Sequence, residues 1–104
     1  MKLKIKVSPF AVKDIKEAKE YIREENINAI NKFNQILSDS IENLAEFPEL
    51  GMELSNKIEV KTDYRYLIVD EYIIFYKFDC NYLYIYRILS TKRDYMKILF
   101  EWIF

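Results

Sequence analysis

The stretch YRYLIVDEYIIFYKFDCNYLYIYRILSTKRDY, residues 64–95, decides the fold of this chain. It contains three runs dominated by Ile, Val, Tyr and Phe, namely LIVD, YIIFYKF and YLYIYRIL, a composition typical of β-strands. Breaks of turn length separate the runs at residues 70–71 and 79–81. The runs are therefore predicted to pair as an antiparallel meander.

Upstream of the meander, apolar residues recur at three- and four-residue steps, which predicts two amphipathic helices. Ser8 and Pro9 have the residue types of an N-cap and a first helical position. Asn28 is a plausible cap for the second helix, which Phe47-Pro48 ends. The predicted apolar stripes are Ala11, Ile15, Ala18 and Ile22, then Ile30, Phe33, Leu37, Ile41 and Leu44. The predicted solvent side of the first helix carries Lys13, Asp14, Lys16, Glu17 and Glu20.

These elements predict an α+β fold, in which a helical hairpin at residues 10–47 packs on an antiparallel sheet built mainly from residues 64–89. Residues 1–104 are expected to form a single domain. The alternating segment 2–7 predicts an opening strand whose lysines protect an exposed sheet edge. Residues 52–57 are expected to be an irregular loop.

Tyrosines alternate along the last strand, so Tyr82, Tyr84 and Tyr86 share one face. In the strand before it, one face carries Tyr72, Ile74, Tyr76 and Phe78. A tyrosine-rich face that the helices leave open suits a protein or peptide partner. The alternative is that the tail after Lys92, a short helix or an extended segment, folds back over this face.

Composition excludes several kinds of chemistry. The chain has no histidine, so Ser-His and Cys-His nucleophile pairs and imidazole-based metal sites are excluded. Its single cysteine, Cys80, and single glycine give no basis for a metal site or a phosphate-binding loop. The net charge of −1 does not fit a broad nucleic-acid surface. No cofactor and no membrane segment are expected, and a cytosolic location is expected.

The phrase LAEFPELG, followed by IIFYKFD and RILSTKRDY, resembles the RelE/ParE family of type II toxins. The resemblance covers nearly the whole chain. It implies a toxin that a cognate antitoxin holds inactive, with no small-molecule substrate. One branch of the family cleaves mRNA on the ribosome, and the other poisons DNA gyrase.

The endonuclease branch has an arginine early in the strand that corresponds to residues 72–78, and this chain has Ile73 there. Its second arginine, after the last strand, matches Arg93, and its tail tyrosine falls on Leu99. Arg65 and Arg87 are candidates to replace the missing guanidinium, which such a transition state requires. Because these matches are incomplete, the resemblance favours gyrase inhibition. The alternatives are mRNA cleavage, with Arg93 catalytic, and an inactive or purely protein-binding member.

The predicted partner-binding residues follow from the tyrosine row and the basic segment after the last strand. They are Tyr84, Tyr86, Arg87, Lys92, Arg93 and Tyr95.

Overall fold

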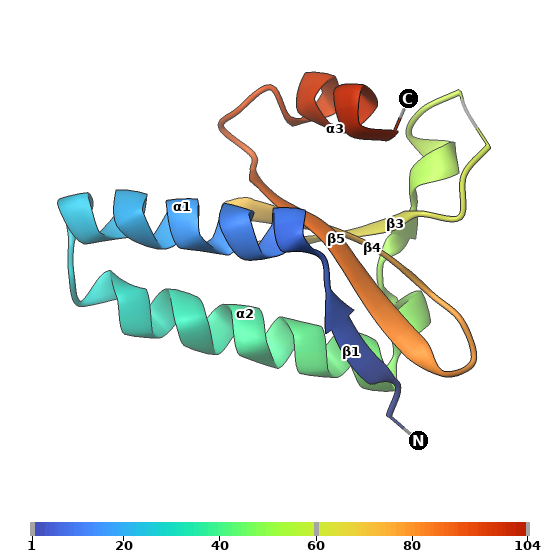
Figure 1. The fold of residues 1–104 in the computed structure, drawn as a ribbon, viewed down its shortest axis with the longest axis horizontal. Helices are drawn as coiled ribbons and strands as arrows, with labels where there is room; N and C mark the ends of the chain where they lie inside the picture. Colours follow the sequence, from blue (N-terminus) through green and yellow to red (C-terminus); the bar gives the residue numbers. More distant parts are fainter. Residues whose placement is uncertain (1, 60, 104) are drawn as a thin grey trace.

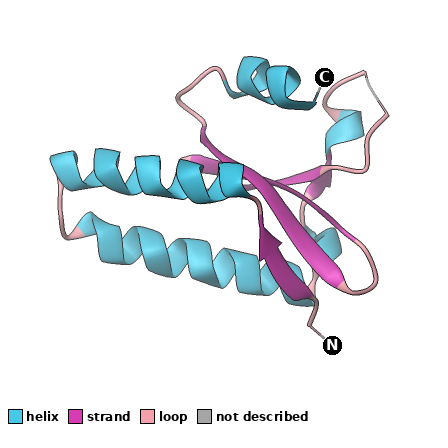
Figure 2. Cartoon of the chain, in the orientation of Figure 1, coloured by secondary structure: helices cyan, strands magenta, loops and turns pink. Residues whose placement is uncertain are grey.

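The computed structural model describes residues 2–59 and 61–103. The bounds of its helices and strands are β1 Lys4–Val7, α1 Pro9–Glu25, α2 Ala29–Glu46, β2 Met52–Glu53, β3 Arg65–Val69, β4 Tyr72–Phe78, β5 Tyr82–Ser90 and α3 Tyr95–Ile103. The predicted α+β class, the helical hairpin and a short C-terminal helix are all present (Figure 2). None of the helices in the described residues is long and apolar enough to cross a membrane.

The strands form one sheet in the order β1-β5-β4-β3-β2. The predicted antiparallel meander is its centre, with β3 paired to β4 and β4 to β5. The first turn places Asp70 at φ 56°, a left-handed conformation that Asp tolerates in turns. The sheet is mixed, because β1 runs parallel to β5. The loop prediction for residues 52–57 was wrong in part, since β2 pairs with Tyr66 and Arg65.

The start of α1 is fixed by Ser8, as predicted. Its Oγ accepts a hydrogen bond from the Ala11 N–H at 3.0 Å and donates one to the Tyr86 carbonyl at 2.6 Å. The Ser8 hydroxyl therefore both caps α1 and ties it to β5. The predicted side-chain cap at Asn28 is not formed. The Asn26 side chain instead accepts the Asn28 N–H at 3.0 Å, in the short connection between the helices.

The α1–α2 hairpin covers one face of the sheet (Figure 1). Phe33, Leu37 and Leu44 are buried, as their spacing predicts. They pack with residues of β4 and β5, namely Ile74, Tyr76, Leu83, Ile85 and Ile88. The row Tyr72, Ile74, Tyr76 and Phe78 therefore faces the helices, whereas Tyr82, Tyr84 and Tyr86 face away from them.

A second apolar cluster lies on the other face of the sheet, where α3 packs (Figure 1). Its buried members are Leu54, Ile58, Tyr66, Ile73, Phe75, Leu89 and Leu99. The tail thus forms a helix that covers this part of the face, and the tyrosines of β5 stay half-buried beside it. The tail therefore covers one region of this face and leaves the region beside the β5 tyrosines open.

Candidate partner-binding surfaces

The tyrosines of β5 form a continuous row on the open face of the sheet. The ring centroids of Tyr82 and Tyr84 lie 5.8 Å apart, and those of Tyr84 and Tyr86 lie 6.3 Å apart. The ring of Tyr64, the residue directly before β3, meets that of Tyr86 edge-on, with the ring centroids 5.0 Å apart. Alternation along β5 explains the row, because Leu83 and Ile85 between the tyrosines point into the core.

A shallow groove of about 640 Å³, called here the tyrosine groove, lies beside this row. Its lining residues are Glu53, Thr62, Asp63, Tyr64, Arg65, Lys77, Phe78, Asp79, Tyr84 and Tyr86. The Lys77 ammonium lies 5.5 Å from the centre of the Tyr86 ring and 5.7 Å from that of Tyr64. Such a combination of aromatic faces, polar hydroxyls and a cation is typical of protein-binding surfaces.

Asp79 stabilises the end of this groove. Its Oδ1 accepts the N–H groups of Asn81 and Tyr82, both at 2.8 Å, and these backbone hydrogen bonds lower the pKa of the Asp79 carboxyl. The Tyr84 hydroxyl donates to Asp79 Oδ2 at 3.1 Å. Desolvation, followed by this hydrogen bond, raises the pKa of Tyr84. Tyr84 is therefore held as a neutral donor with its ring presented to the groove.

Arg87 does not face the tyrosine groove. A β-bulge shifts the register between β4 and β5, and the Arg87 side chain reaches α1. Its Nε and Nη2 donate to the two carboxylate oxygens of Asp14 at 2.8 and 2.9 Å, and Asp14 Oδ2 also accepts the Ile88 N–H at 3.0 Å. The prediction that Asp14 faces solvent was wrong, because its side chain is only 5% exposed in this buried ion pair.

Lys92 and Arg93 line a separate groove of about 290 Å³ between α1 and the end of β5, called here the basic-segment groove. Lys92 pairs with Glu71 at 3.2 Å, and this hydrogen bond raises the pKa of Lys92. Arg93 is exposed and forms no ion pair with a carboxylate of the described residues. Asp94 caps α3, since its Oδ1 accepts the Lys97 N–H at 3.3 Å.

Tyr95 lies at the start of α3 and packs toward the second apolar cluster, with its ring 6.5 Å from that of Phe75. The Lys57 ammonium lies 5.6 Å from the Tyr95 ring centre. Ile73 and Leu99, which the resemblance predicted at the Arg and Tyr positions of the endonuclease branch, are each only 1% exposed. Both therefore belong to the core and not to a surface.

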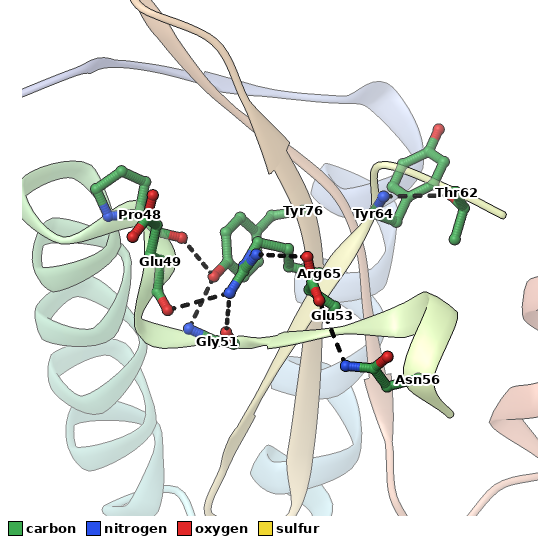
Figure 3. A network of polar contacts seen from close by, with 9 residues as sticks. All are labelled: Pro48, Glu49, Gly51, Glu53, Asn56, Thr62, Tyr64, Arg65 and Tyr76. Carbon is green, nitrogen blue, oxygen red and sulfur yellow. Dashed lines mark hydrogen bonds and ion pairs between the residues drawn. The ribbon is translucent and has the colours of Figure 1, made fainter. Parts of the chain in front are cut away.

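Arg65 borders the tyrosine groove, but its guanidinium is held by the loop before β2 (Figure 3). Its Nη2 donates to the Gly51 carbonyl at 2.9 Å and the Glu49 carbonyl at 3.2 Å, and its Nη1 lies 3.7 Å from Glu53. In the same network, the Tyr76 hydroxyl donates to the Pro48 carbonyl at 2.7 Å and accepts the Gly51 N–H at 2.9 Å. Arg65 and Tyr76 thus fix this loop against the sheet.

Gly51→Ala is expected to destabilise the protein by about 1–3 kcal/mol, because no room exists for a methyl group there. A Cβ at Gly51 would meet the Tyr76 hydroxyl and lie 2.6 Å from the Tyr66 carbonyl oxygen. Tyr76→Phe should cost a similar amount, since it leaves two backbone groups without their partner. Chemical denaturation measures both, with Tyr84→Phe as the exposed-hydroxyl control. A Gly51→Ala protein as stable as the parent would contradict this packing.

The structure divides the predicted site residues between two surfaces. Tyr84, Tyr86 and Arg65 border the tyrosine groove, whereas Lys92 and Arg93 border the basic-segment groove. Arg87 borders neither predicted surface as a free cation, because it forms an ion pair with Asp14. Sequence reasoning missed Lys77, Tyr64 and Asp14, and for Lys77 and Asp14 the sequence holds a signal that could have found them. Lys77 lies directly across from Tyr84 in the hairpin register, and Asp14 stands three residues after Ala11, at the border of the apolar stripe.

Within residues 2–59 and 61–103, no three His, Cys, Asp or Glu side chains are placed to hold a metal ion. The arrangement offers two surfaces for macromolecules. The basic side chains that the sequence singled out do not gather on one surface, since Arg65 borders the tyrosine groove, Lys92 and Arg93 border the basic-segment groove, and Arg87 pairs with Asp14.

Comparison with known proteins gave a match over most of the chain. Residues 5–95 match the family model described as "ParE toxin of type II toxin-antitoxin system, parDE". Among solved structures, a chain from the "Chromosomal ParDE TA system from P. aeruginosa" has a similar fold, with a TM-score of 0.70. The match has 13% identity and covers 85% of this chain and 95% of that chain. A search of the curated proteins gave no match.

Proposed function

Since the chain belongs to the ParE toxin family of type II toxin-antitoxin systems, we propose that it inhibits DNA gyrase by binding it. An antitoxin is the expected partner of such a toxin. Cleavage of mRNA is not part of the proposed activity. The observation that carries this proposal is the burial of Ile73 and Leu99 in one apolar cluster.

Burial of these two residues argues against phosphodiester chemistry on this face. Cleavage through the 2′-OH needs cationic side chains around a phosphate that gains negative charge in the transition state. Ile73 and Leu99 instead pack with Phe75 and Leu89, and α3 covers this part of the sheet. Arg65 and Arg87 are also engaged elsewhere, by backbone carbonyls and by Asp14. Arg93 would have to act without a second guanidinium.

The antitoxin is proposed to bind across the tyrosine groove and the basic segment. Tyr84 and Tyr86 offer half-buried rings on the tyrosine groove, and the exposed Arg93 offers positive charge on the separate basic-segment groove, where Lys92 is paired with Glu71. Tyr95, the first residue of α3, is proposed to take part from its place beside the second apolar cluster. A partner that contacts both grooves must wrap around β5, which suits an extended segment and not a rigid domain.

The rival activity is ribosome-dependent mRNA cleavage, and the exposed Arg93 is the observation that favours it. Primer extension on ribosome-bound message after induced expression separates the two activities. We expect the message to stay uncut while the cells filament, because replication and not translation is blocked. Cleavage in the ribosomal A site that Arg93→Ala abolishes, and that Lys97→Ala leaves intact, would assign the chain to the endonuclease branch.

A further inference from the structure

The chain between the end of α2 and the end of β2, called here the 46–53 segment, displays apolar side chains to solvent. It lies at the end of the molecule opposite to the connection between α1 and α2 (Figure 1). Phe47 is 59% exposed, Leu50 54% and Met52 62%. Single exposed apolar side chains are ordinary, but three large ones on one short segment with a polar rim are typical of an interaction site.

The sheet holds the backbone of this segment in one conformation (Figure 3). The Tyr76 hydroxyl and the Arg65 guanidinium bind its backbone carbonyls, and the Tyr76 hydroxyl also accepts a backbone N–H. Within the segment, the Leu50 N–H donates to the Phe47 carbonyl at 3.0 Å. A surface fixed in this way loses little conformational entropy when a partner binds it.

The exposed side chains themselves are not needed to hold the segment in place. The hydrogen bonds from Tyr76 and Arg65 all end on backbone atoms of the segment. Among the described residues, neither Phe47 nor Leu50 belongs to one of the two apolar clusters. Polar side chains at positions 47 and 50 would therefore leave the described packing intact, and the apolar ones call for a different explanation.

Carboxylates surround these apolar side chains. Glu46 and Glu49 are exposed, and neither forms an ion pair within 4.0 Å among the described residues. The cations next to the segment are already paired with carboxylates, namely Arg65 with Glu53 and Lys2 with Glu42. The four carboxylates outnumber the two cations, so the rim of the segment is negatively charged.

We propose that the 46–53 segment docks into an apolar pocket rimmed by Lys and Arg on DNA gyrase. An enzyme that binds DNA concentrates positive charge on its surface, because neutralisation of phosphates drives that binding. Phe47 and Leu50 would fill the pocket, and Glu46 and Glu49 would meet its basic rim. This inference rests on the proposed function, since it names the surface through which the inhibition acts.

The position of the segment also suits control by the antitoxin. Glu53 and Arg65 line the tyrosine groove, so an antitoxin seated in that groove lies next to the segment and obstructs access to it. A second copy of this chain is a poor occupant, because two acidic rims would face each other.

Surface plasmon resonance with the full chain immobilised and purified DNA gyrase in solution tests the proposal. The double variant Phe47→Ser with Leu50→Ser should weaken binding by about tenfold or more. The double variant Glu46→Lys with Glu49→Lys should weaken it as well and reduce its dependence on salt. Lysine is compatible with the last turn of α2, where it meets the negative end of the helix.

Matched controls separate the segment from the rest of the surface. Ile27→Ser removes an exposed apolar side chain at the opposite end of the molecule, and Glu20→Lys with Glu24→Lys reverses two exposed charges on α1. Both should bind gyrase like the parent. Melting curves establish that each variant is folded.

Gyrase binding that both segment variants retain in full would overturn this inference and leave the proposed function standing. An equal loss in the Ile27→Ser control would overturn it too, since binding would then not depend on this segment. A parent chain that does not bind gyrase would overturn the proposed function and this inference together. Self-association of the parent that Phe47→Ser with Leu50→Ser abolishes would assign the segment to a second copy instead.

Discussion

Asp14→Ala is expected to lower the free energy of unfolding by about 3–5 kcal/mol, the cost of removing one partner from a buried ion pair. The Arg87 side chain is 15% exposed, so its charge would lose its carboxylate where little water can replace it. The Ile88 N–H would also lose the acceptor that it reaches at 3.0 Å. For a chain of this length, the melting temperature should fall by roughly 12–40 °C.

Two further variants identify the cause of this loss. Asp14→Asn keeps an acceptor for Ile88 but removes the charge, so its effect should be intermediate. Glu20→Ala, on the exposed side of the same helix, should change stability by less than about 0.5 kcal/mol. A double-mutant cycle with Arg87→Ala measures the coupling between Asp14 and Arg87 directly. Simple additivity in that cycle would contradict the ion pair described here.

The double variant Tyr84→Ala with Tyr86→Ala is expected to weaken antitoxin binding by roughly 100-fold or more. Buried aromatic anchors at interfaces typically contribute about 2 kcal/mol or more each, and each 1.4 kcal/mol corresponds to about tenfold in affinity. Both rings line the tyrosine groove and lie half-buried before any partner binds. Titration calorimetry with the protein encoded beside this gene measures the effect.

The matched control is Ile27→Ala, at the tip of the helical hairpin, where the side chain is 65% exposed. This variant should bind the antitoxin with unchanged affinity. Melting curves establish that the tyrosine variant is folded. An affinity within about twofold of the parent would remove the tyrosine groove from the antitoxin interface.

Elements with strong periodicity could be predicted from the sequence, because local pattern determines them. The hairpin follows from apolar spacing and from Ser8-Pro9, and the meander follows from β-forming runs with turn-length breaks. The parallel pairing of β1 with β5 joins segments that are far apart in the sequence, and no local sequence pattern predicts this pairing. β2 has only two residues, too few for a periodic pattern to be recognised.

The site was harder to predict for the same reason. The alternation of residues along β5 predicts that its tyrosines share one face. It does not predict which face of the strand points toward the helices. The bulge near Tyr86 then carries Arg87 away from that row and toward Asp14. Consequently, the basic residues that appear close in the sequence lie in different environments, with Arg87 largely buried in its ion pair and Arg93 exposed.

The most direct measurement for the central claim is supercoiling of relaxed plasmid by DNA gyrase in the presence of the purified protein. We predict that supercoiling falls as the protein is added and that prior saturation with the antitoxin restores it. Arg93→Ala should report whether the basic-segment groove takes part, while Ile27→Ala should inhibit like the parent. Undiminished supercoiling, together with A-site cleavage of ribosome-bound message by the same preparation, would contradict the account.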